Sequence, residues 1–75
     1  MFIENSLPYH QASNLAVHRA RTEYEVIYIV KGTGIGVYHA VTAEELEEHY
    51  PNNKIMCYFQ PEEGWFNMDG SHFYS

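Results

Sequence analysis

Four glutamates stand within five residues of this sequence, at Glu44, Glu45, Glu47 and Glu48. On a helix rising about 1.5 Å per residue they would carry about one charge per 1.5 Å of axis, against about 1.7 Å in duplex DNA. Such a row is typical of a face that docks onto a basic partner, or of a solvated face that maintains solubility. Acid–base catalysis would need a pocket around the carboxylates, which a short surface helix does not offer.

Three further acids follow without nearby lysines, and we expect them to extend the negative surface: Glu62, Glu63 and Asp69. Residues 42–75 contain seven carboxylates against Lys54 alone, so the whole formal net charge of −6 falls in this half. A field of this kind speeds encounter with basic proteins. The charge asymmetry therefore favours recognition of a basic protein, and disfavours direct contact of the chain with nucleic acid.

Other residues with chemical potential lack the spacing that a reaction needs. The five histidines contain no close-spaced pair of metal ligands: His10, His18, His39, His49 and His72. We therefore expect scattered imidazoles, although a site assembled from distant positions stays open. Cys57 stands among apolar residues and is expected to pack in the core, with no activating base beside it. The sequence thus predicts no catalytic residue, no metal and no cofactor.

A glycine run, Gly32-Thr33-Gly34-Ile35-Gly36, raises the possibility of a phosphate-binding loop. Such loops lead into the N-terminus of a helix, whose amides face the anion. Here the run leads into a stretch with the alternation of a strand. We interpret it as a tight turn between two strands.

Aromatic side chains are concentrated near the end of the sequence, at Trp65, Phe66, Phe73 and Tyr74. Protein interfaces are enriched in such residues, so Trp65 is predicted to serve as an apolar anchor beside the acids. The alternative is that these rings cap a thin core, and the sequence leaves both open.

Composition limits the class of protein. The 75 residues suffice for one domain, and contents of 45% hydrophobic and 16% aromatic residues predict a folded body. No apolar run approaches the roughly 20 residues of a membrane span, and no basic segment followed by an apolar stretch suggests a signal peptide. With a single cysteine, we expect a cytoplasmic protein, in the host cytoplasm if it is phage-encoded. So small a core favours stabilisation by a partner, and we expect a homodimer.

The middle of the chain predicts two strands joined by a hairpin. Glu23 to Lys31 alternates with apolar residues on both faces, which indicates a central strand. After the Gly32-Thr33-Gly34 turn, Ile35 to Val41 returns as the second strand, with Ile35 on its apolar face.

A short helix and a third strand follow. Thr42 and Glu45 have the spacing of a capping box, and Ala43, Leu46 and Tyr50 form the inward stripe of a helix that ends at Pro51. Glu44, Glu47 and Glu48 would share its exposed side. Lys54 to Gln60 is the third strand, with Ile55, Cys57 and Phe59 on one face.

The expected fold class is α+β: one small domain over residues 1–75, with an antiparallel sheet and a ββαβ core over 23–60. Residues 1–22 form an N-terminal extension, in which the alternation of Leu15 and Val17 favours a strand over a short helix across 14–22. Residues 61–75 form an aromatic tail or a hairpin, with Trp65 to Met68 and Ser71 to Tyr74 flanking the Asp69-Gly70 turn.

In layout and charge, Tyr24 to Gln60 resembles the small acidic host-takeover proteins of bacteriophages, such as the inhibitors of uracil-DNA glycosylase. The shared features are two strands, a brief glutamate-rich helix and an aromatic third strand. The resemblance implies a dimer whose carboxylates stand in for DNA phosphates. The first 22 residues and the aromatic tail depart from that family, so no residue roles are carried over.

The sequence therefore favours a non-enzymatic, DNA-mimicking inhibitor that occupies the basic DNA-binding surface of a host protein. A nucleoid protein, a DNA-repair enzyme and RNA polymerase all fit as the partner. The alternative is a homo-oligomeric structural or assembly protein that acts through its aromatic surface. A histidine-dependent metalloprotein or catalyst is the least favoured hypothesis.

Overall fold

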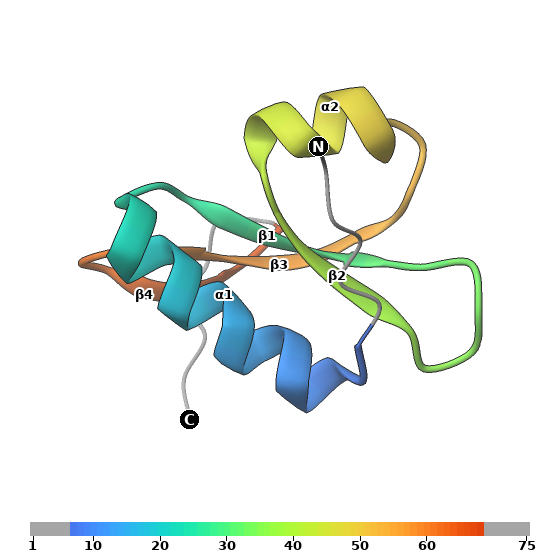
Figure 1. Ribbon diagram of the computed structural model, residues 1–75, viewed down its shortest axis with the longest axis horizontal. Coiled ribbons are helices and arrows are strands. Elements are labelled where there is room, and N and C mark those ends of the chain that lie inside the picture. The colour runs from blue at the N-terminus through green and yellow to red at the C-terminus, as the bar shows by residue number, and fades with distance from the viewer. Residues whose placement is uncertain (1–6, 69–75) are drawn as a thin grey trace.

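The computed structural model describes residues 7–68, which form two helices and a four-stranded antiparallel sheet. The elements are α1 (Tyr9–Glu23), β1 (Ile27–Lys31), β2 (Tyr38–Thr42), α2 (Ala43–His49), β3 (Ile55–Gln60) and β4 (Gly64–Asn67). The strands lie in the order β2-β1-β3-β4, with α1 and α2 packed on opposite faces (Figure 1). The chain is thus a single α+β domain, as predicted, and the ββαβ succession of its core is confirmed.

β1 is the central strand that its two apolar faces predicted. It pairs with β2 on one side and with β3 on the other. Ile27 and Ile29 are buried under α1, whereas Val30 is buried on the opposite face with Val41. The strand begins at Ile27 rather than at Glu23, because α1 continues through Glu23 and Tyr24 ends it in the left-handed region at φ 54°.

α1 covers one face of the sheet through a row of alanines. Ala12, Ala16 and Ala20 recur every four residues, so they lie on one side of the helix, and all three are fully buried. The strand expected over residues 14–22 is therefore wrong. The four-residue spacing of the alanines fits a helix with one buried side. Leu15 and Val17 are only partly buried against the same cluster. The segment regarded as an extension supplies one of the two layers.

α2 begins with the predicted capping box. The Glu45 amide donates to Oγ1 of Thr42 (3.2 Å), and the Thr42 amide donates to Oε1 of Glu45 (3.1 Å). Leu46 and Tyr50 pack toward Val30 and Val41, as expected, but Ala43 is exposed rather than inward.

β2 begins later than predicted, at Tyr38, and Ile35 lies in the preceding loop rather than in the strand. The Gly32 amide donates to the Val37 carbonyl (2.7 Å), which closes a loop over residues 32–37. A tight turn was expected here, but the chain forms a wider loop. Its three glycines permit backbone angles that other residues rarely adopt, and Gly36 has φ 73°.

β3 contains an irregularity that the alternation does not reveal. Ile29 pairs with Cys57, but Val30 pairs with Ile55, so the register shifts at Met56. Because of this shift, Ile55 lies on the face of the sheet that α2 covers, whereas Cys57 lies on the face that α1 covers. The prediction that the two residues share one face is therefore wrong.

The strand predicted to begin at Trp65 is confirmed as β4. It pairs with β3, and residues 61–63 form the turn between the two strands. The expected hairpin around Asp69-Gly70 has its second half outside the described residues.

The close approach of α1 to the sheet can be tested at Ala16. We expect Ala16→Leu to lower the free energy of unfolding by about 1–3 kcal/mol, because the added side chain has no space between helix and sheet. The measurement is urea unfolding followed by circular dichroism. Asn14→Leu, at an exposed position of the same helix, should change stability by less than about 0.5 kcal/mol. Equal losses in both variants would contradict the packing described here.

Candidate functional site

The outer side of α2 presents three glutamates to solvent. Glu44, Glu47 and Glu48 are exposed on the side opposite Leu46 and Tyr50, as the sequence predicted. The Glu48 side chain is 64% exposed, and its Oε1 lies 3.6 Å from Nε2 of His49. These three carboxylates are available to a docking partner.

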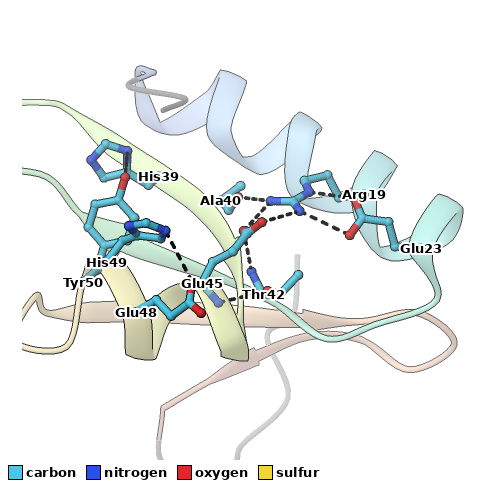
Figure 2. A network of polar contacts seen from close by, with 9 residues as sticks. All are labelled: Arg19, Glu23, His39, Ala40, Thr42, Glu45, Glu48, His49 and Tyr50. Carbon is cyan, nitrogen blue, oxygen red and sulfur yellow. Dashed lines mark hydrogen bonds and ion pairs between the residues drawn. The ribbon is translucent and has the colours of Figure 1, made fainter. Parts of the chain in front are cut away.

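Glu45 belongs to a different environment, although it is their neighbour in sequence. Its carboxylate accepts two hydrogen bonds from the Arg19 guanidinium of α1, at 2.9 and 3.1 Å (Figure 2). The same guanidinium donates to the Glu23 carboxylate at 2.9 and 3.2 Å and to the Ala40 carbonyl of β2 at 2.9 Å. Arg19 therefore joins α1, β2 and the start of α2.

Partial burial makes this network stronger than a surface ion pair. The side chains of Arg19 and Glu45 are 17% and 25% exposed. The guanidinium lowers the pKa of the Glu45 carboxyl, and donation to Glu45 raises the pKa of Arg19. Glu45 is thus bound within the fold, whereas the other three glutamates of α2 are exposed.

Glu62 and Glu63 lie in the turn between β3 and β4, away from α2 (Figure 1). They lie in a turn at the end of β3 rather than on α2, so their share in a common negative surface stays a prediction. The Tyr24 hydroxyl donates to Oε2 of Glu62 (2.6 Å), and this bond to the carboxylate raises the pKa of Tyr24.

The turn borders a cavity that no local sequence signal indicated. It measures about 320 Å³ and is lined by residues 24–26 and 60–63. Glu25 therefore joins Glu62 and Glu63 around it, although 37 residues separate Glu25 from Glu62 in the sequence. Val26 and Pro61 add apolar surface.

Trp65 is engaged within the chain. Its ring packs edge-on against Phe59, with centroids 5.1 Å apart, at the margin of the α1-side core. This contact supports a role in capping the core. Asp69, the remaining acid expected at the site, lies outside the described residues.

Cys57 occupies the core position that its sequence context predicted. It is 1% exposed, and burial raises the pKa of its thiol. A thiol that stays protonated is a poor nucleophile. Within residues 7–68, no three His, Cys, Asp or Glu side chains are grouped so as to hold a metal ion.

Comparisons with protein-family models, with curated proteins and with solved structures gave no significant match to this chain. In the part of the chain that the structure describes, neither helix has the length and apolar character needed to cross a bilayer.

The network around Arg19 predicts a pH-dependent contribution to stability. We expect Arg19→Gln to lower the free energy of unfolding at neutral pH by about 1–3 kcal/mol, because it leaves the Glu45 carboxylate partly buried without its cation. The Glu45 pKa is lowered by folding, so the stabilisation is present above its unfolded pKa and lost as the pH falls through the folded value. The difference between wild type and variant should therefore shrink as the pH falls from about 5 to about 3.

Urea unfolding across that pH range measures the effect. Arg21→Gln is the matched control, because Arg21 is an exposed arginine on the same helix. A stability difference for Arg19→Gln that does not vary with pH would show that the ion pair is not its source.

Proposed function

We propose that this chain is a non-enzymatic binding module that docks the α2 surface onto the basic, DNA-binding surface of another protein. In this role it acts as a DNA mimic of the kind that bacteriophages direct against host proteins. The observation that carries the proposal is the exposed row of Glu44, Glu47 and Glu48 on α2.

The charge density of that row supports the proposal even without Glu45. Three carboxylates over about 6 Å of helix axis give about one charge per 2 Å, close to the one per about 1.7 Å of duplex DNA. In the described structure, no lysine or arginine forms an ion pair with the row, and the nearest imidazole contact is that of Glu48 with His49 at 3.6 Å. Arg19, the arginine that reaches α2, is already bound to Glu23 and Glu45.

The rigid placement of α2 supports docking as well. The capping box holds its first turn, Arg19 fixes Glu45 against β2, and Leu46 and Tyr50 attach the helix to the sheet. A helix that is already fixed loses no further backbone freedom on binding, so more of the interaction energy of its side chains appears as affinity.

The alternative function, assembly through an aromatic surface, receives less support. Its principal anchor, Trp65, packs against Phe59, and two of its other rings, Phe73 and Tyr74, lie outside the described residues.

A displacement experiment tests the proposed function. The probes are a purified histone-like nucleoid protein, RNA polymerase and uracil-DNA glycosylase, each bound to a fluorescent DNA duplex. We expect the chain to displace the duplex from at least one of them. Glu44→Gln, Glu47→Gln and Glu48→Gln combined should weaken that competition about tenfold at low salt, since three exposed ion pairs contribute about 0.5 kcal/mol each.

The matched control combines Glu62→Gln and Glu63→Gln, which remove acids from the turn between β3 and β4 rather than from α2 and should leave competition nearly unchanged. Affinity for the probe should fall as salt rises from about 50 to about 500 mM, and less steeply for the α2 variant. Failure to displace DNA from any of the three probes, or equal effects of the two sets of substitutions, would contradict docking through α2.

A further inference from the structure

The two ends of the central strands differ in charge. β1 ends at Lys31 and β3 follows Lys54, and the Lys31 amide donates to the Lys54 carbonyl (2.8 Å), so the two lysines lie side by side. Both are exposed, and neither forms an ion pair with the residues that the structure describes. This end of the sheet is therefore cationic on an acidic protein.

An apolar side chain projects from the same end. Ile35, in the loop of residues 32–37, is 102% exposed, and the loop extends beyond the sheet (Figure 1). Val37 lies close to the backbone at Gly32 and Gly34, within 2.8 and 3.2 Å of where a Cβ would stand, and so fills the inner side of the loop. Ile35 is left on the outer side, where no packing in the described structure requires an isoleucine.

The opposite end of the same strands holds the cavity of about 320 Å³. Val26 and Pro61 give it apolar surface, and Glu25, Glu62 and Glu63 surround it with negative charge. Its volume is many times the ~30 Å³ of a water molecule, so it admits a branched aliphatic side chain.

We propose that copies of this chain associate head to tail, with Ile35 of one copy seated in the cavity of the next. Lys31 and Lys54 would then face Glu25, Glu62 and Glu63 across the contact. One surface supplies an apolar knob with two ammonium groups, and the other an apolar recess with three carboxylates. This contact is separate from the α2 surface and does not depend on the function proposed for it.

The net charge of −6 does not prevent such contact. At physiological salt the Debye length is about 8 Å, so charges farther apart are largely screened while paired charges in contact still attract. A five-residue strand spans about 17 Å, which places the acids around the cavity beyond that distance from the two lysines of the same copy.

A head-to-tail contact uses two different surfaces, which gives it a signature that a symmetric dimer lacks. Ile35→Asp removes the apolar side chain that enters the cavity and leaves the cavity unchanged. Glu62→Lys with Glu63→Lys reverses the charge around the cavity and leaves Ile35 unchanged. Each variant alone should be monomeric in sedimentation equilibrium. An equimolar mixture should form a 1:1 dimer and nothing larger, because one intact knob meets one intact cavity.

The wild-type chain should increase in mass with concentration up to about 1 mM, the range of weak contacts. Thr33→Ala changes another exposed side chain of the same loop without adding charge, and Glu47→Lys with Glu48→Lys makes on α2 the charge change of the cavity variant; both controls should associate like wild type. Circular dichroism verifies that each variant is folded. A monomeric wild type, variants that associate as wild type does, or a mixture that stays monomeric would each overturn head-to-tail association.

Discussion

The ion pair between Arg19 and Glu45 links the two helices, each of which also packs on its own face of the sheet. α1 and α2 lie on opposite faces of the sheet, so no apolar cluster connects them. The Arg19 guanidinium donates to the Ala40 carbonyl of β2 and to the Glu45 carboxylate. The same carboxylate accepts from the Thr42 amide and so caps α2. Because Glu45 performs both tasks, the start of α2 and its position against α1 are determined together. Removing one partner of a partly buried pair costs more than the pair gains net, which makes both residues hard to replace.

Local patterns predicted the elements whose causes are local. The capping box of Thr42 and Glu45 spans four residues, and the two apolar faces of β1 are legible in its own sequence; both were correct. The errors have causes that lie elsewhere in the chain. The alternation of Leu15 and Val17 suggested a strand, but the alanines of this segment pack against a sheet whose strands all lie later in the sequence. The irregularity at Met56 depends on the register with β1, and the pairing of Arg19 with Glu45 spans 26 residues. Exposed acids could be recognised from the sequence, but their partners could not.

Folding also divides the acidic residues by task. In the sequence, Glu44, Glu45, Glu47 and Glu48 look alike, yet one of them is bound to an arginine and three face solvent. Glu62 and Glu63 look like a continuation of that cluster, yet they border a cavity that also draws in Glu25 from the neutral half of the chain. The charge asymmetry along the sequence is thus divided in the described structure between α2 and the turn that follows β3.

Distance then decides how these groups can act. The described molecule measures 27 × 25 × 20 Å, and charges farther apart than about 8 Å hardly sense one another at physiological salt. Carboxylates of α2 and of the turn between β3 and β4 that lie farther apart than this present separate local fields to anything that approaches. The net charge of −6 governs approach from a distance at low salt, whereas affinity at a contact depends on the few charges within it. Two surfaces of one small acidic domain can in this way recognise cationic groups of different geometry, because each is defined by its own spacing of carboxylates and its own apolar neighbours.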